Sequence, residues 1–264
     1  MKIYLKLLKK ILKNGQIKKN RTGINTLSIF GHQIKINLNN QFPLITTKKC
    51  NISAIIYELL WFLKGDTNIK YLNKKKINIW NQWANKNGDL GPIYGAQWRK
   101  WKTINKKKID QIQSAIDLLK KDPNSRRIIV SSWNPGDIKK MSLPPCHILF
   151  QFYVINNTLS CQIYQRSCDV FLGLPFNIAS YAILINMFAQ QCNFNLGELI
   201  WTGGDVHLYI NHLSQAKEQL KRIPKKLPLL KIVKKRKSIF DYKFKDFKIE
   251  NYKPYSSIKA EIAI

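Results

Sequence analysis

The stretch Ile148–Tyr164, ILFQFYVINNTLSCQIY, contains two strand-like runs on either side of the tripeptide Asn156-Asn157-Thr158. Both runs are rich in β-branched and aromatic residues, and short Asn-containing turns commonly join antiparallel strands. The stretch therefore predicts a β-hairpin. The apolar segment Ile178–Gln191 follows and has the length of a helix, which predicts that strands and a buried helix share one core.

The rest of the chain continues this alternation of helical and extended patterns. Helices are predicted over Met1–Leu12, over Ser53–Leu63 with Ser53 as N-cap, and over Ile109–Leu119. Extended segments are predicted over Thr26–Leu38, Ile128–Val130, Leu229–Val233 and Tyr242–Ile249. The fold class is therefore mixed α/β (α+β). No linker or repeat divides the 264 residues, so we expect a single domain over 1–264.

The charge is strongly basic, with a formal net charge of +30. Such a field attracts polyanions, which makes a nucleic-acid-binding protein the rival interpretation from another class. The lysines are scattered among many Ile and Asn residues, and A/T-rich codons encode all three, so we interpret the charge as drift on solvated surfaces. RNA binding could coexist with catalysis, and the steepness of binding against salt would reveal it.

Five cysteines without a C-x-x-C pair indicate neither a disulfide framework nor a zinc site. They favour a reducing, cytoplasmic location, and no metal is expected. Lysines interrupt the apolar residues at the N-terminus, so we expect neither a secretory signal nor a membrane segment there. Leu8, Ile11 and Leu12 are expected to pack on the domain.

The best candidate for a nucleophile is Cys146, in Leu143-Pro144-Pro145-Cys146-His147, because two prolines fix the approach to its thiol. A lone cysteine is more often a small buried hydrophobe than a catalyst. A reactive thiolate needs nearby positive charge, and Arg166 at the end of the adjacent hairpin strand supplies it.

Pro145-Cys146-His147 followed by Gln165-Arg166-Ser167-Cys168-Asp169 and Val170–Asn177 resembles the signature of the thymidylate synthase family. The agreement extends in order along the chain. Its other segments are Asn20–Gly23, Glu58–Phe62, Leu90–Gly95, Ser125–Ile128 and Gly204–Tyr209. The chain is similar to the compact bacterial form of the family.

The resemblance implies a large twisted mixed sheet flanked by helices, and a homodimer formed through that sheet. It implies conversion of deoxyuridine monophosphate (dUMP) to thymidine monophosphate, with 5,10-methylenetetrahydrofolate as one-carbon donor and reductant. The Cys146 thiolate would add to uracil C6. No nicotinamide is needed, and no G-x-G-x-x-G motif follows a strand.

The resemblance also implies roles for particular residues. The catalytic residues would be Cys146, Glu58, Tyr94 and Arg166. Substrate would contact Arg21, Arg166, Ser167, Cys168, Asp169, Asn177, His207 and Tyr209, together with Arg126 and Arg127 from the partner subunit. Folate would contact Ile79, Trp80, Trp83, Leu143, Asp169, Leu172, Gly173, Phe176, Ala263 and Asn51, and the terminal Ile264 carboxylate would belong to a closing tail.

Each role has a simpler alternative. Arg126 and Arg127 could be a solvated basic pair, Asn177 a helix N-cap, and Glu58 an exposed carboxylate on the polar side of its helix. His207 and Tyr209 could make structural hydrogen bonds, and the apolar folate contacts could be core residues. A pyrimidine hydroxymethylase of the same superfamily is the closest rival activity, against which Asn177 and Trp80 argue.

Four positions depart from the family pattern. Asn51 stands where a basic residue is usual, Asn81 and Gln82 stand where acids are common, and Glu261 replaces a proline in the tail. These changes bear on folate affinity and on closure of the tail.

Overall fold

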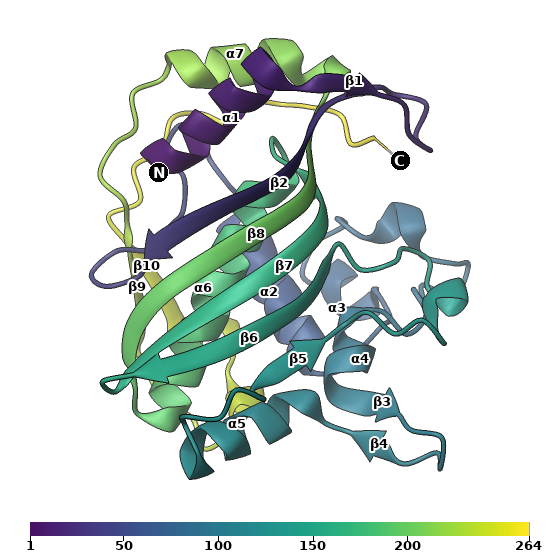
Figure 1. The fold of residues 1–264 in the computed structure, drawn as a ribbon, viewed down its shortest axis with the longest axis vertical. Coiled ribbons are helices and arrows are strands. Elements are labelled where there is room, and N and C mark those ends of the chain that lie inside the picture. Colours follow the sequence, from purple (N-terminus) through teal and green to yellow (C-terminus); the bar gives the residue numbers. More distant parts are fainter. Residues whose placement is uncertain (264) are drawn as a thin grey trace.

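The structure is a computed structural model that describes residues 1–263; the expected role of Ile264 lies outside the described residues. Its central feature is a six-stranded sheet with helices packed behind it (Figure 1). The helices are α1 Lys2–Asn14, α2 Ile52–Leu63, α3 Lys70–Asn73, α4 Tyr94–Lys100, α5 Gln111–Lys121, α6 Gly173–Cys192 and α7 Leu213–Lys221. The strands are β1 Gln16–Lys18, β2 Thr26–Asn37, β3 Trp101–Lys102, β4 Lys108–Ile109, β5 Ile129–Ser131, β6 His147–Ile155, β7 Thr158–Asp169, β8 Asn195–Tyr209, β9 Leu229–Ile232 and β10 Phe247–Glu250.

The large sheet has the strand order β1-β2-β8-β7-β6-β5. Its strands are antiparallel neighbours except for β7 and β8, which run parallel. A parallel pair needs a crossover, and α6 supplies it. This arrangement is a mixed sheet flanked by helices, and the predicted fold class is confirmed.

The predicted hairpin is β6 and β7, paired from Ile155 with Thr158 down to His147 with Gln165. Asn156 and Asn157 form its two-residue turn with φ angles of 47° and 55°. Turns with positive φ at both central positions match the twist of the flanking strands, and asparagine tolerates this conformation better than most residues. The turn sets the register of the hairpin, and a shift of that register between His147 and Leu149 brings Cys146 beside Arg166.

The core lies between the sheet and the helices α2 and α6, and its buried side chains form one contiguous cluster. Helix α6 is buried on nearly all sides, which explains why its sequence shows no polar stripe. In α1, Leu8 and Ile11 are buried as expected, whereas Leu12 is only half-buried. Within residues 1–263, no helix has both the length and the apolar character needed to cross a membrane.

Three predicted element boundaries differ from the structure. Helix α2 begins at Ile52, and its cap is Asn51, whose side chain accepts a hydrogen bond from the Ala54 amide at 3.1 Å, so Ser53 is inside the helix. Helix α6 begins at Gly173, earlier than Ile178, because Pro175 fits the first turn of a helix. Of Tyr242–Ile249, only Phe247 onward is a strand; short 3₁₀ turns precede it.

Candidate active site

A cavity of about 680 Å³ lies at the end of the sheet where β7 and β8 meet α6. Residues from α2, α4 and β2 complete its walls together with the segment before β6 and the C-terminal tail. Cys146, Glu58, Tyr94, Arg166 and Asn177 all line this one cavity. The fold thus brings together groups that are more than 100 positions apart in the sequence.

Cys146 lies directly before β6 and is held there by its backbone. Its amide donates to the Tyr94 hydroxyl at 2.7 Å, and its carbonyl accepts from the Arg166 amide at 2.8 Å. The Arg166 guanidinium donates to the carbonyls of Pro144 and Pro145, at 2.9 and 2.8 Å. The two prolines therefore fix both the thiol and the cation beside it.

Burial raises the pKa of the Cys146 thiol above its ordinary value, while Arg166, the Tyr94 hydroxyl and Arg21 act in the opposite direction. The positive charge expected beside the thiol is present, yet it offsets only part of the cost of desolvating a thiolate. Ionisation of Cys146 thus depends on the groups that surround it in the cavity.

Glu58 is buried in α2, where its carboxylate oxygen Oε1 accepts a hydrogen bond from the Trp80 indole at 2.7 Å. Burial raises the pKa of Glu58 to about 7, against the smaller opposite effect of that hydrogen bond. A carboxyl group with this pKa can both accept and release a proton near neutral pH. The alternative of an exposed carboxylate is wrong for this residue.

Tyr94 is buried and stacks on the His147 ring, with 4.2 Å between the ring centroids. Burial raises the pKa of the Tyr94 phenol well above its ordinary value, with further contributions from Cys146 and Glu58. The hydroxyl therefore stays protonated and acts by hydrogen bonding. His147 bonds the Tyr181 hydroxyl at 2.8 Å, and burial lowers its pKa to about 3, so it stays neutral.

The orientation of the Asn177 amide follows from a chain of three hydrogen-bonding groups. The Trp201 indole, which can only donate, donates to Gln165 Oε1 at 2.9 Å. Gln165 Nε2 must then face Asn177 and donates to its Oδ1 at 3.1 Å. Gly203 makes room for the Trp201 ring, because a Cβ there would lie 2.3 Å from the ring. The Asn177 amino group is thereby left to face the cavity.

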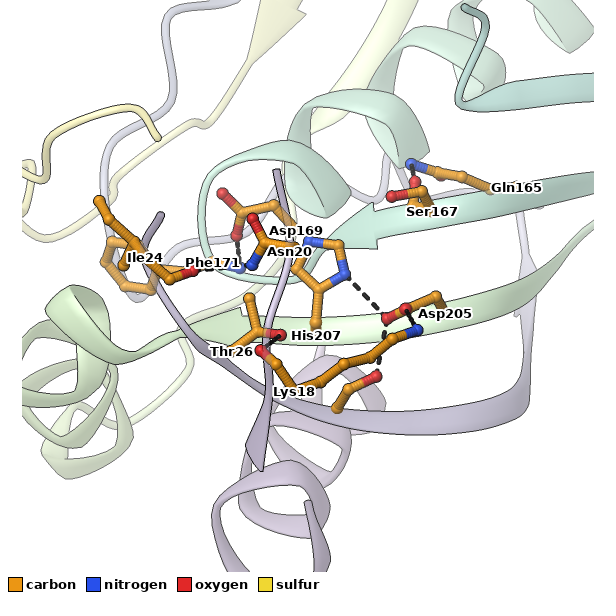
Figure 2. Close-up of polar contacts among 11 residues, drawn as sticks. Lys18, Asn20, Ile24, Thr26, Gln165, Ser167, Asp169, Phe171, Asp205 and His207 are labelled. Carbon is orange, nitrogen blue, oxygen red and sulfur yellow. Dashed lines mark hydrogen bonds and ion pairs between the residues drawn. The ribbon is translucent and has the colours of Figure 1, made fainter. Parts of the chain in front are cut away.

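The outer end of the cavity is polar and more exposed. Arg21 projects from a turn in which Asn20 accepts from the Thr22 amide at 2.9 Å and donates to the Ile24 carbonyl at 2.7 Å. Ser167, His207 and Tyr209 line the cavity from β7 and β8. The rings of His207 and Tyr209 lie side by side, with 5.3 Å between their centroids, as the spacing of the two residues on one strand predicted. Figure 2 shows His207 with its partner Asp205, and Asn20 with its partner Ile24.

The remaining wall is apolar and aromatic. It consists of Ile79, Trp80, Trp83, Leu143, Leu172, Gly173 and Phe176, with Ala263 and Ile262 from the tail. Asp169 uses Oδ1 to accept from the amides of Phe171 and Leu172, at 2.8 and 3.1 Å, which leaves its second oxygen uncommitted in these contacts. The buried Trp83 indole nitrogen has no hydrogen-bond partner among the described residues. A flat aromatic ligand with polar ring edges suits this wall.

The tail is attached through its backbone. The Glu261 carbonyl accepts a hydrogen bond from His212 Nε2 at 2.6 Å, while the Glu261 side chain is exposed. A proline at this position would keep the same carbonyl, so the anchor does not depend on the departure from the family pattern.

Four of the residues predicted for the site are not brought into the cavity. Arg126 and Arg127 are exposed and lie outside its lining. Cys168 is fully buried, because strand alternation directs its side chain away from the face that carries Ser167 and Asp169. Asn51 caps α2 instead of lining the cavity. Asn81 and Gln82 are also exposed and outside it.

A sequence model of the thymidylate synthase family matches residues 2–264. The thymidylate synthase of Buchnera aphidicola subsp. Schizaphis graminum is 69% identical over 264 residues, which is all of both chains. Those of Buchnera aphidicola subsp. Acyrthosiphon pisum (strain APS) and subsp. Baizongia pistaciae are 66% and 63% identical, again over 100% of each chain. The chain belongs to the thymidylate synthase family. The resemblance inferred from the motifs is therefore confirmed.

Several residues of this thymidylate synthase family cavity were missed by sequence reasoning. Gln165 and Asp205 lie inside the motifs and could have been noticed, because each is a polar residue one strand period from a predicted ligand. Lys18, Asn20, Thr22 and Thr26 also line the cavity. Asn20 and Thr22 also lie inside a quoted motif, Asn20–Gly23, whereas nothing in the local pattern separates Lys18 and Thr26 from ordinary surface residues. Among the described residues, no cluster of three or more His, Cys, Asp or Glu side chains could hold a metal ion.

Proposed function

We propose that this chain catalyses the reductive methylation of dUMP to thymidine monophosphate, with 5,10-methylenetetrahydrofolate as the second substrate. The observation that carries the proposal is the cavity itself, where a thiol, a cation and a carboxyl group of raised pKa adjoin a polarised amide. This set of groups provides what a nucleophilic attack on a pyrimidine ring needs.

The substrate would lie with its phosphate at the outer end and its base at the inner end. Arg21, Arg166 and Ser167 would bind the phosphate, for which the guanidinium fork is well suited. His207 and Tyr209 would bind the sugar hydroxyl. The Asn177 amino group, left free by Gln165, would donate to uracil O4.

Cys146 would form a bond from Sγ to uracil C6, and the electron pair of the C5–C6 double bond would move toward O4. This makes C5 nucleophilic. Arg166, fixed by the proline carbonyls, would stabilise the thiolate before the attack. Glu58 would move protons to and from the base at O4, since its pKa of about 7 suits both directions. Tyr94, which stays protonated, would position the group that removes the C5 proton.

The apolar wall fits a reduced folate, because its indole and phenyl rings offer flat surfaces and Asp169 offers a free acceptor for a ring N–H. When bound, the folate supplies the one-carbon unit and the hydride, and it leaves as dihydrofolate. Trp80, Trp83 and Phe176 would hold its ring, and the tail residues Ile262 and Ala263 would keep water from it.

We further propose a homodimer formed through the uncovered face of the sheet. In Figure 1 the helices α2 and α6 lie behind β6, β7 and β8, and no helix covers their near face. Ile129, Tyr153 and Ile155 share one face of β5 and β6 and are 45%, 60% and 54% exposed. Arg126 and Arg127 precede β5 and are exposed, and they are the side chains that a partner packed on this face would receive in the proposed shared site.

A cytoplasmic location suits a thiol nucleophile, because a reducing compartment keeps it from forming disulfides. All five cysteines are free thiols, with Cys161 and Cys168 buried in the core.

The decisive experiment is an assay for dihydrofolate formation from dUMP and 5,10-methylenetetrahydrofolate, followed by absorbance. We expect turnover with dUMP and none with deoxycytidine monophosphate. Formation of hydroxymethylated nucleotide without dihydrofolate would identify a hydroxymethylase instead. The absence of both products in a folded protein would contradict the proposed function.

A further inference from the structure

Asp205 lies at the centre of a polar network at the outer end of the cavity. Its oxygen Oδ1 accepts from His207 Nδ1 at 3.1 Å and from the Ser28 hydroxyl at 2.7 Å, and Oδ2 accepts from Lys18 Nζ at 2.6 Å. The partners come from β8, β2 and β1, respectively. Figure 2 shows Lys18 and His207 approaching the carboxylate from different directions.

The network determines where His207 carries its proton. The pKa of Asp205 lies well below its ordinary value, chiefly because His207 donates a hydrogen bond to it, so Asp205 is a carboxylate that only accepts. Nδ1 of His207 must therefore carry a hydrogen. In the neutral ring, the other nitrogen, Nε2, is then an acceptor. That nitrogen points away from Asp205 in Figure 2, and His207 lines the cavity.

We propose that Asp205 is a positioning residue that holds His207 in its Nδ1–H form, so that Nε2 accepts a hydrogen bond from the 3′-hydroxyl of the substrate. The proposal rests on the proposed function, because dUMP has one free hydroxyl on its sugar, the 3′-hydroxyl. Asp205 would thus select a nucleotide with a donor at the 3′ position without touching the nucleotide itself.

Lys18 and Ser28 keep the carboxylate from rotating away from His207. Ser28 stands opposite His207 in the register of β2 with β8, and Lys18 ends β1, three positions before Arg21. The network thereby ties the segment that carries Arg21 to the strand that carries His207. The Lys18 side chain is 59% exposed, so its ion pair contributes little by itself and serves mainly to orient Asp205.

A purely structural role is the competing explanation, since Asp205 also links β8 to β2 through Ser28. Loss of such a link would weaken the fold and affect every substrate equally. It would leave the proton on His207 where it was. Two measurements separate the explanations.

The first measurement is the ¹⁵N NMR spectrum of the four histidine rings, with His207 assigned by its loss in His207→Gln. We expect the wild-type ring in the Nδ1–H form. In Asp205→Asn, Lys18 attracts the amide oxygen, so the amide nitrogen turns to His207 and the ring should change to the Nε2–H form. A wild-type ring in the Nε2–H form overturns the proposal, and this result needs neither turnover nor a folded Asp205 variant.

The second measurement compares kcat/KM for dUMP with that for its 3′-deoxy analogue. We expect Asp205→Asn to reduce the preference for dUMP by about tenfold, the range of one hydrogen bond, mostly through KM. Gln33→Ala is the matched control: it removes another side-chain hydrogen bond between β2 and β8, from Gln33 Nε2 to Thr202 Oγ1 at 3.1 Å, outside the cavity lining, and should leave the preference unchanged. If Asp205→Asn lowered kcat/KM equally for dUMP and for its 3′-deoxy analogue, the proposal would be overturned. Failure of wild-type turnover would instead contradict the proposed function and leave the NMR test in force.

Discussion

The inner and outer ends of the cavity use polar groups in opposite ways. At the inner end, Glu58, Gln165 and Trp201 are buried, and each has a hydrogen-bond partner of fixed polarity. At the outer end, Arg21 and Lys18 are exposed. Burial makes an unmatched group costly, whereas water screens the outer charges. Under the proposed function, the inner end would choose a base and react with it, and the outer end would attract and align the phosphate.

The largest effect should follow from removing the thiol at the inner end. Cys146→Ala should abolish dihydrofolate formation and covalent trapping by 5-fluoro-dUMP, because no other cysteine lines the cavity within residues 1–263. Nucleotide binding, measured by calorimetry, should persist, since the outer end is intact. Cys192→Ala, which alters a half-buried cysteine outside the cavity lining, is the control and should keep its turnover. Turnover in Cys146→Ala would refute its role as nucleophile.

A second prediction tests whether Arg126 and Arg127 of one subunit complete the outer end of the partner's cavity. Arg126→Glu chains and Cys146→Ala chains should each be inactive alone, whereas a mixture refolded together should recover about a quarter of wild-type activity, because half of the random dimers contain one complete site. Activity of the mixture is the measurement. If heterodimers form, as shown by mass spectrometry of differently tagged chains, and stay inactive, the arginine pair does not cross the interface.

The direction of the hydrogen bonds at Asn177 predicts that a substitution there changes which pyrimidine base the protein prefers. In Asn177→Asp, the carboxylate would keep the bond from Gln165 and turn its other oxygen to the base. Facing uracil O4, that oxygen would cost roughly a few kcal/mol, whereas the cytosine amine would donate to it. The ratio of kcat/KM for deoxycytidine and deoxyuridine monophosphates should rise by about a hundredfold or more. An unchanged ratio would mean that residue 177 does not read the base.

A smaller effect concerns how the free energy of unfolding depends on pH, through Glu58 at the inner end. Glu58 has a folded pKa of about 7 and an ordinary value of 4.5, so the folded state binds the extra proton. Its stabilising contribution is complete below pH 4.5 and disappears as pH rises through 7. From urea unfolding, wild type should lose up to roughly 3 kcal/mol between these pH values relative to Glu58→Gln. Parallel pH curves for the two proteins would show that Glu58 is not desolvated.

Sequence reasoning found the reactive groups because their types and spacing are local. The thiol after two prolines, the arginine on the next strand and the Asn-rich turn predicted the hairpin, because a two-residue turn sets its register, but not the shift of register between His147 and Leu149. The exact start of a helix was less predictable. Asn51 and Ser53 are both good helix caps, and only the backbone path before α2 decided between them. Cys168 was predicted as a ligand from its motif, but the pleat of β7 buries it.

The sequence by itself determined the family, the mixed architecture and the candidate nucleophile, because these depend on residue types in order. The tertiary structure alone decided how those groups are tuned. The raised pKa of Glu58, the direction of the Trp201–Gln165–Asn177 chain and the ion pair of Lys18 with Asp205 each require residues distant in sequence. Desolvation and hydrogen-bond polarity are properties of an enclosed space, and that space exists only when the sheet, α2 and α6 are assembled.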